Sequence, residues 1–261
     1  MTDRSPLRTL AQTTLVAAGL LVASQSVAHQ LWMEPTDEGL AMYYGYLDRN
    51  LREVSPGRLD EIVVPRADRI TDSGSEAVAI SNEGDHLALD TSPDAPVLLV
   101  FDNGQVYENE RDGETVGTHW TMATRYAPQN DEPAEPRLDF DIVPTGEPGA
   151  FRVTLHGDPV DSGHTVRLST EYGWTMDRRT EDDGVVTFPS LPWQGVYAVA
   201  SRHNVAEAGT RERILADGGT ETIDHDRRGF VTTLTFRKTE GREPLPPLPK
   251  SAPYEEGVRA Q

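Results

Sequence analysis

The chain has 261 residues, a formal net charge of −19 and no cysteine. The acidic balance disfavours nucleic acids and anionic lipid surfaces as partners. The absence of cysteine excludes disulfides, thiolate metal sites and cysteine nucleophiles, and the length allows one large domain or two of ordinary size.

Residues 1–28 have the pattern of a secretory signal peptide. Arg4 and Arg8 precede an apolar run that is too short to span a bilayer, and Ser26-Val27-Ala28 forms a small-x-small cleavage site. Cleavage after Ala28 predicts an exported, periplasmic protein that begins at His29. The mature chain then carries 22 Lys and Arg against 42 Asp and Glu, a formal charge of −20.

The first half of the mature chain contains short alternating or apolar runs between turn-forming residues, which is typical of strands. We expect strands over Gly39–Tyr46, Glu61–Val64, Ala77–Ile80, His86–Leu89, Val97–Phe101 and Gln105–Tyr107. Asp102-Asn103-Gly104 predicts a hairpin turn between the last two strands. The segment Thr118–Tyr126 fits a strand or a short helix, and its pattern does not decide between them.

The composition shifts to Pro, Asp, Glu, Gln and Asn from Ala127 to Pro136, as in a linker or a long exposed loop. The second half then shows about seven short strand patterns at intervals of about ten residues. They cover Leu138–Val143, Phe151–Leu155, His164–Ser169, Val185–Phe188, Val196–Arg202, Glu212–Leu215 and Phe230–Phe236.

These patterns predict an all-β protein with two β-sandwich domains of immunoglobulin-like or transthyretin-like type. We expect a signal peptide over residues 1–28, an N-terminal sandwich over 29–137, a second sandwich over 138–237 and a Pro-rich tail over 238–261. The prolines of the tail cannot pair in a sheet, so the tail should be extended or disordered.

His29 is the first candidate functional residue, because a mature N-terminal histidine offers two nitrogens to one ion. Its α-amine and its imidazole both lose their protons near neutral pH, and histidine is the commonest metal ligand. The structural alternative is that His29 only begins a strand and that cleavage falls a residue or two away.

Two stretches resemble secreted bacterial proteins described as periplasmic components of ABC-type cobalt/nickel transport. The first is the start of the mature chain, His29-Gln30-Leu31-Trp32-Met33-Glu34-Pro35. The second runs from Gly157-Asp158-Pro159 to Gly195-Val196-Tyr197 and resembles the family's second domain, a carboxypeptidase-regulatory-like sandwich in which Asp183-Gly184 makes a turn. A Tyr-Ala-Lys segment common in the family is absent here, where Tyr126-Ala127 is followed by Pro128.

The resemblance implies a transition-metal site and a membrane transporter as partner. His203 is the second candidate ligand, because it follows an expected strand and the family often has a histidine at this strand end. With the α-amine and the His29 ring, it would complete a three-nitrogen site for copper or nickel, and cobalt is the third ion considered. His119 is the next candidate. For both, the structural alternative is a histidine that only packs or hydrogen-bonds within the fold.

Other polar clusters favour structural interpretations. Asp224-His225-Asp226 is typical of a solvated loop in so acidic a chain, as are His86 and His164, and Glu34 lies too far along an extended chain to share an ion with His29. The four tryptophans are more typical of core positions than of a binding groove.

The chain has no motif of a hydrolase, a nucleotide-binding loop or a zinc protease. The sequence therefore favours a periplasmic binding protein for nickel, cobalt or copper that assists metal uptake or trafficking, rather than an enzyme. The alternative is a periplasmic interaction module that docks to a membrane partner or a glycan without metal. A lesser alternative is a copper-dependent oxidative enzyme with a site at the N-terminal histidine.

Overall fold

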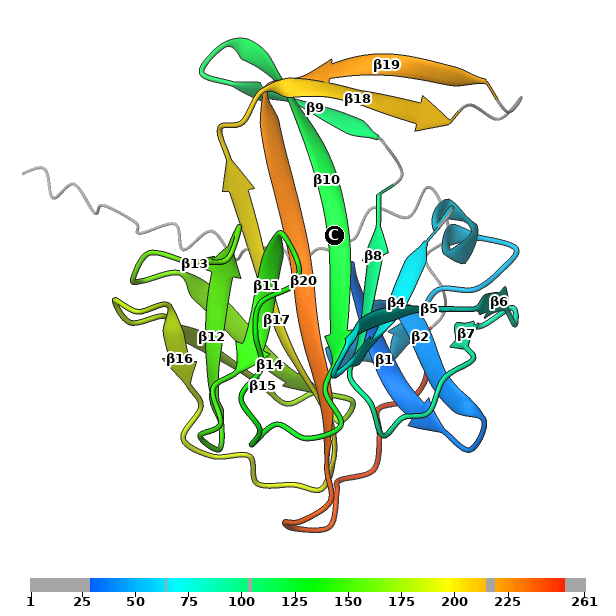
Figure 1. Ribbon diagram of the computed structural model, residues 1–261, viewed down its shortest axis with the longest axis vertical. Helices are drawn as coiled ribbons and strands as arrows, with labels where there is room; N and C mark the ends of the chain where they lie inside the picture. Colours follow the sequence, from blue (N-terminus) through cyan, green and yellow to red (C-terminus); the bar gives the residue numbers. More distant parts are fainter. Residues whose placement is uncertain (1–28, 64, 103–104, 215–218, 252–261) are drawn as a thin grey trace, which may run out of the picture.

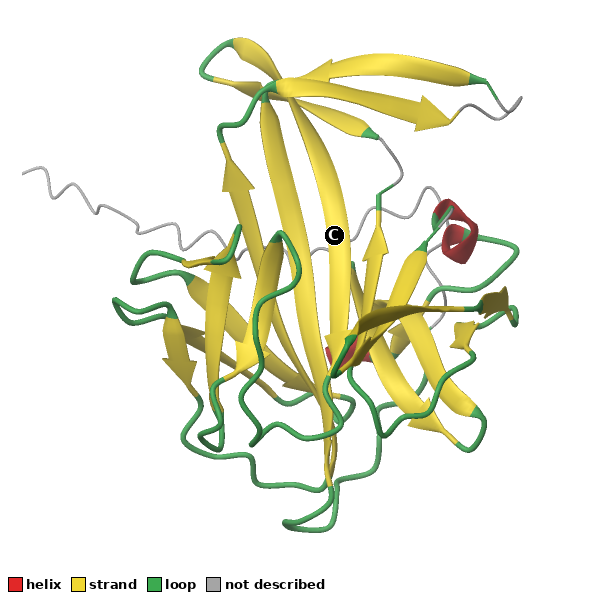
Figure 2. Cartoon of the chain, in the orientation of Figure 1, coloured by secondary structure: helices red, strands yellow, loops and turns green. Residues whose placement is uncertain are grey.

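The computed structural model describes residues 29–63, 65–102, 105–214 and 219–251, and the signal-peptide prediction lies outside these residues. The described chain is almost entirely β-strand (Figure 2), with two short 3₁₀ helices and no α-helix. None of its helices is long and apolar enough to cross a membrane. The prediction of an all-β sandwich fold is confirmed.

The first sheet lies at the right of Figure 1 and comes from the N-terminal half. Its order is β1 (Gln30–Thr36), β2 (Gly39–Tyr46), β7 (Leu87–Leu89) and β6 (Ile80–Asn82), and β3 (Leu51–Arg52) also pairs with β2. All of these pairs are antiparallel. The 3₁₀ helices η1 (Leu47–Arg49) and η2 (Arg58–Glu61) flank β3 along the chain.

The largest sheet among the described residues contains strands from both halves of the chain. Its order is β15 (Thr175–Arg179), β14 (Thr165–Thr170), β17 (Gly195–Val205), β20 (Arg227–Lys238), β10 (Glu114–Tyr126), β8 (Val97–Phe101), β4 (Arg66–Thr71) and β5 (Gly74–Val78). A further strand, β9 (Val106–Arg111), pairs with β10. The long strands β10 and β20 run parallel, and they join the two halves at the centre of Figure 1.

Two smaller sheets complete the fold. The first contains β11 (Phe140–Pro144), β12 (Ala150–Leu155), β13 (Asp158–Pro159) and β16 (Val185–Thr187). The second is a hairpin of β18 (Gly209–Ile214) and β19 (Thr220–His225). This hairpin and the β9–β10 hairpin extend beyond the rest of the molecule at the top of Figure 1, and we call them together the arm.

Each half has its own hydrophobic core. The N-terminal core lies between the first sheet and the β10, β8 and β4 part of the large sheet, with Met33, Met42, Leu99 and other side chains buried. The second core lies between the β11–β12 sheet and β14, β17 and β20. Every second residue of these strands, such as Phe140 and Ile142 of β11, belongs to a core, because successive side chains of a strand point to opposite faces.

The large sheet runs across the predicted boundary between residues 137 and 138, because β10 and β20 pair over nine positions. The two cores therefore share one sheet, and the division into two separate domains stays a prediction. Ala127 itself is buried and its amide donates to the Thr235 carbonyl at 2.9 Å, so the chain is held to β20 where the expected linker begins.

Two local predictions in the first half are wrong. The described part of Glu61–Val64 is not a strand: η2 ends at Glu61, since the Asp60 carboxylate accepts the Gly57 amide at 2.9 Å and closes a tight turn. Among the described residues, β8 and β9 do not pair in the expected hairpin, because both run antiparallel to β10 along successive parts of it. The turn residues Asn103 and Gly104 lie outside the described residues.

Other expectations agree with the observed elements. Thr118–Tyr126 lies within the long strand β10, and Asp183-Gly184 forms a turn in which the Gly184 amide donates to the Glu181 carbonyl at 3.0 Å. The described tail after Lys238 forms no strand. It is held to the body near Leu248, whose carbonyl accepts the Asn50 side-chain amide at 2.5 Å.

Candidate functional site

His29 lies immediately before β1, the edge strand of the first sheet. Its imidazole is mostly buried between Tyr44 and Tyr46, with ring centroids 4.9 Å and 4.6 Å away. Its Nε2 atom lies 2.6 Å from Oε1 of Glu53 and 3.4 Å from Nη1 of Arg58. Pairing of β1 with β2 positions the ring, because Gln30 lies opposite Gly45.

Glu53 is the residue that sequence reasoning missed at this position. It follows β3, its amide donates to the Tyr44 carbonyl at 2.8 Å, and its side chain is only 1% exposed. Its Oε1 atom faces His29, whereas Oε2 is buried with no hydrogen-bond partner in the described part of the chain. A buried carboxylate oxygen without a partner is energetically costly, and a cation bound beside it would offset that cost.

The electrostatics of the pocket favour a neutral His29 ring. Burial lowers the pKa of His29, while the hydrogen bond with Glu53 acts in the opposite direction. The neutral imidazole is the form that binds metal ions. With Nε2 held by Glu53, the other ring nitrogen and a free α-amine are the atoms suited to hold an ion, and the carboxylate orients the ring.

His203 lies near the end of β17 and is not brought together with His29. Its neighbours are His164, with ring centroids 5.2 Å apart, and Phe140, at 5.5 Å. None of these rings is among the neighbours of His29, and Figure 1 shows β20 and β10 between the end of β17 and the start of β1. A shared ion at His29 and His203 therefore gains no support from the observed contacts.

His164 and His203 form a cross-strand pair instead. Val166 lies opposite Ser201, and continuing this antiparallel register places His164 opposite His203. His164 Nε2 lies 2.7 Å from the Ser201 hydroxyl. Burial, and then the nearby His203, lowers the pKa of His164 to about 4. Burial also lowers the pKa of His203, and Asp161 opposes that shift.

His119 lies inside β10, where its side chain is nearly inaccessible. Its Nε2 atom lies 2.8 Å from Oδ1 of Asp102, and its ring centroid lies 5.3 Å from that of His225. The interpretation of residues 224–226 as a solvated loop is wrong for His225, which ends β19 and is 7% exposed. Gly209 lies opposite His225, and the absence of a side chain there lets β18 cover its ring.

The other candidates have structural partners. Glu34 accepts hydrogen bonds from Trp32 and Arg52. His86 pairs with Asp85 at 2.6 Å. His156 follows the end of β12. Of the four tryptophans, only Trp32 is fully buried.

No group of three or more His, Asp or Glu side chains in the described residues is arranged to hold a metal ion. The buried side-chain polar atoms without partners in these residues are five threonine hydroxyls and three other atoms. These three are Oε2 of Glu53, Nδ1 of His119 and Nδ1 of His225. All three are potential metal ligands, and they occur at two places only.

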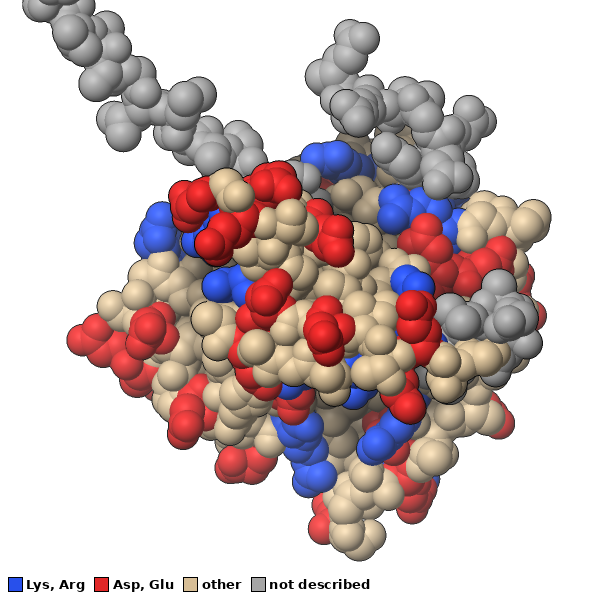
Figure 3. All heavy atoms as spheres, turned by 90° about the horizontal axis from the view of Figure 1, so that it is seen from above, with Lys and Arg blue, Asp and Glu red and all other residues tan. Residues whose placement is uncertain are grey.

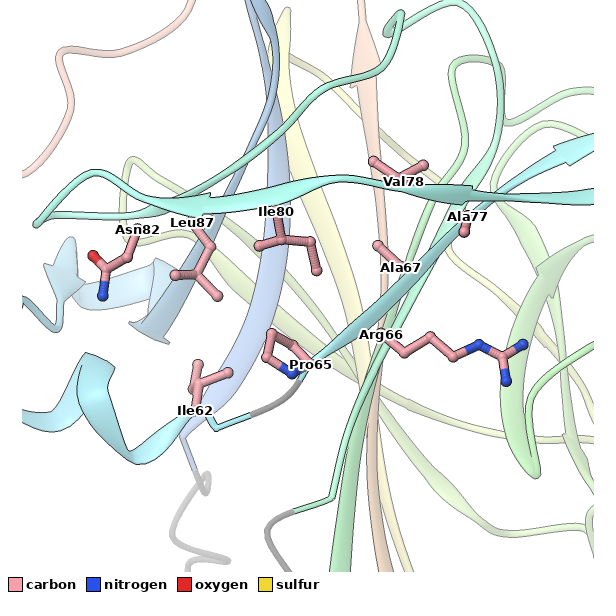
Figure 4. A pocket seen from close by; sticks show the side chains of 9 residues that line it. All are labelled: Ile62, Pro65, Arg66, Ala67, Ala77, Val78, Ile80, Asn82 and Leu87. Carbon is pink, nitrogen blue, oxygen red and sulfur yellow. The ribbon is translucent and has the colours of Figure 1, made fainter. Parts of the chain in front are cut away.

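An apolar hollow of about 460 Å³ lies at the surface of the described part of the chain. Figure 4 shows Ile62, Val78, Ile80 and Leu87 around it, with Arg66 at one end. No aromatic ring lines it, so it lacks the stacking surface typical of glycan sites. Acidic side chains are spread over the face in Figure 3, with basic ones among them.

Comparison with known proteins identifies no relative of this chain. No family model, no curated protein and no solved structure matches the chain.

Proposed function

We propose that this protein is a periplasmic binding protein for a transition-metal ion, nickel, cobalt or copper, and that it assists metal uptake or trafficking. The observation that carries the proposal is the pocket of His29, where a buried carboxylate with one unpartnered oxygen holds the ring of the expected first residue. The resemblance of residues 29–35 to the start of the cobalt/nickel transport proteins supports the same function.

The proposed ligands are the α-amine and Nδ1 of His29. The α-amine is free to bind an ion when the chain begins at this residue. Glu53 accepts from Nε2 and so fixes the ring, as carboxylates do for many metal-binding histidines. Its second oxygen lies in the same buried pocket and offers a third donor or a counter-charge. His203 has no part in this version of the site.

The chemistry of the donors suits a borderline divalent ion. Amine and imidazole nitrogens bind copper, nickel and cobalt, and the general order of affinity places copper first in vitro. Affinity alone therefore does not identify the cargo, which depends on which ion the periplasm supplies. The strongly acidic surface attracts cations in general and adds to the rate of capture.

The test compares two forms of the protein by native mass spectrometry, with copper, nickel and cobalt offered in competition. The form that begins at His29 should bind one ion more than the form that retains Ala28, because retention of Ala28 blocks the α-amine. His29→Ala should lose this additional ion as well. Glu53→Gln should weaken binding by roughly 10–100-fold.

His203→Ala is the matched control, because it removes a histidine of similar burial outside the pocket. It should leave the ion in place. Retention of the ion by His29→Ala, or no uptake by the form that begins at His29, would contradict the proposal. Loss of the ion in His203→Ala alone would return His203 to the site.

The alternative function is a metal-independent interaction module. The apolar hollow of Figure 4 favours it, and the lining favours an apolar segment of a protein partner over a glycan. Capture of the same membrane partner by wild-type protein and by His29→Ala, in a chelator, would support this alternative.

A further inference from the structure

The base of the arm contains a second pair of candidate ligands, remote in sequence from His29. His119 comes from β10 and His225 from the end of β19, and their rings are in contact. Figure 1 shows β10 and the end of β19 meeting where the two hairpins of the arm join. Their ring centroids are 5.3 Å apart with a tilt of 31°. The residues are 2% and 7% exposed, so both are at least nine-tenths buried.

The hydrogen bonds of His119 determine which nitrogen carries its lone pair. Asp102 accepts from Nε2 at 2.8 Å, and its other oxygen accepts from Arg211 of β18. An ionised carboxylate only accepts hydrogen bonds, so Nε2 carries the proton and Nδ1 carries the lone pair. That Nδ1 atom is buried and has no partner in the described part of the chain.

His225 is the other ring of this contact. Its Nδ1 atom is also buried without a hydrogen-bond partner among the described residues. Leaving one such group unsatisfied costs about 1–3 kcal/mol, and here two lie in adjacent rings. A buried orphan atom in a native fold calls for a physical explanation such as a bound ion.

We propose that His119 and His225 together bind a divalent transition-metal ion, of which zinc is the best fit, through their two Nδ1 atoms. This site is independent of the proposed function at His29, because neither ligand requires a free N-terminus. The ion would join strand β10 to strand β19 and hold the β18–β19 hairpin against the rest of the arm.

The separation of the rings agrees with a tetrahedral ion. With metal–nitrogen bonds of about 2.0 Å and about 1.2 Å from nitrogen to ring centre, two imidazoles on a tetrahedral ion have centroids roughly 5.2 Å apart. The same bonds give roughly 4.5 Å for neighbouring positions of a square plane and roughly 6.4 Å for a linear ion. The observed 5.3 Å lies nearest the tetrahedral value.

The surroundings supply negative charge and orient one ligand. Asp102 fixes the His119 ring in the way that carboxylates orient metal-binding histidines. Asp226, next to His225, accepts the Gly117 amide at 2.8 Å, and Gly117 lies two residues before His119. Arg211 of β18 pairs with Asp102 and so joins this hairpin to the same cluster.

Two protein ligands leave further coordination positions for water or for a side chain of a partner. Since no third ligand is grouped with the pair in the described residues, the ion should exchange more readily than at a closed structural zinc site. Such an open site suits an ion that is taken up and passed on.

The His164–His203 pair is the internal rival, because its centroids are 5.2 Å apart. It differs in two respects. Ser201 already occupies Nε2 of His164, and neither ring has a buried nitrogen without a partner in the described chain. Both residues are also more exposed than His119 and His225.

The experiment uses the form that retains Ala28, so that the His29 α-amine is blocked, and titrates it with Zn²⁺ by calorimetry. One ion should bind with micromolar affinity. His119→Gln and His225→Gln should each weaken this binding by at least about tenfold, and Asp102→Asn, which removes no ligand, by roughly 10–100-fold. His203→Gln and the surface variant His156→Gln should leave it unchanged.

A second readout keeps the proposal testable if a variant folds poorly. Zn²⁺ should slow amide hydrogen exchange in β18 and β19 of the Ala28-retaining protein and should shift the ¹⁵N resonances of Nδ1 in His119 and His225. Unchanged zinc binding in both glutamine variants would overturn the proposal. Loss of binding in His203→Gln, with His119→Gln unaffected, would transfer the site to the rival pair.

Discussion

Strand β10 carries two buried polar clusters that differ in how well they are satisfied. Near its end, Arg125 meets Asp141 of β11 in an ion pair that is almost inaccessible to solvent. Six residues earlier, His119 meets His225 with a buried nitrogen unsatisfied on each ring. The two clusters share a strand and a similar degree of burial, so burial alone does not distinguish them.

Both carboxylate oxygens of Asp141 accept hydrogen bonds. Oδ1 accepts Nε of Arg125 at 3.1 Å and the Ile142 amide at 2.9 Å, and Oδ2 accepts the amides of Arg137 and Leu138 as well as Arg125. These bonds join β10 to the segment that leads into β11. A fully bonded buried carboxylate of this kind is part of the structure.

The comparison teaches that unsatisfied atoms, rather than buried charges, identify the candidate sites in this fold. Glu53 belongs with the histidine pair, because it is as buried as Asp141 but has one oxygen without a partner in the described residues. The two regions should therefore respond differently when a side chain is removed.

Asp141→Asn should have the largest effect. It leaves the Arg125 guanidinium buried without its counter-charge, which costs about 3–5 kcal/mol in comparable buried pairs. The free energy of unfolding from urea titrations should fall by this amount.

Asp177→Asn supplies the matched control, because it breaks the Arg167–Asp177 pair on the surface. That loss should stay below about 1 kcal/mol. Equal effects of the two substitutions would mean that the junction at Asp141 contributes no more than an exposed ion pair.

His164 should show an intermediate effect that depends on pH. Its pKa is lowered from 6.5 to about 4, so the unfolded chain takes up this proton at a higher pH than the folded one. Stability should therefore fall as the pH is lowered from 6.5 to 4, by about 1–3 kcal/mol after allowing for partial exposure. Urea unfolding at a series of pH values measures it.

His164→Gln should flatten this part of the stability profile, since glutamine takes up no proton. The difference between wild type and variant isolates His164 from the carboxylates that also titrate near pH 4. His156→Gln changes an exposed histidine outside the pair and serves as the control for the loss of a histidine. A constant difference between wild type and His164→Gln across this range would contradict the assignment.

The sequence predicted strands best where a short apolar run was bounded by turn-forming or charged residues. Gly39–Tyr46 and Val97–Phe101 coincide with β2 and β8. The pairing of β10 with β20 joins residues more than a hundred positions apart, and no local pattern contains that information. The same holds for the failed hairpin at Asp102, where the turn residues are present but β8 and β9 pair with β10 instead.

The candidate sites were predictable only in part. The cleavage pattern identified His29, whereas Glu53 is 24 residues away and resembles any charged residue beside a short strand. His225 looked solvated because its neighbours are aspartates, but the β18 backbone at Gly209 covers it. In both cases the environment of the side chain depends on contacts between strands and not on the composition of its own segment.

His225→Leu should have the smallest effect on the metal-free protein, within about 1 kcal/mol of wild type. The substitution removes a buried nitrogen that has no partner in the described residues, so the lost packing is offset by the lost desolvation cost. Asp141→Asn offers no such compensation. Thermal and urea unfolding in the presence of a chelator measure the difference.

In the form that retains Ala28, added Zn²⁺ should turn this small difference into a large one, because only the folded protein with both histidines holds the ion. At a free zinc concentration of 100 times the Kd, binding stabilises the folded state by about 2.7 kcal/mol, and His225→Leu should gain almost none of it. A variant that gains as much as wild type would show that zinc binds elsewhere. His119 and His225 would then only lower the stability of the fold. The histidine pair would differ from the Asp141 cluster in packing alone.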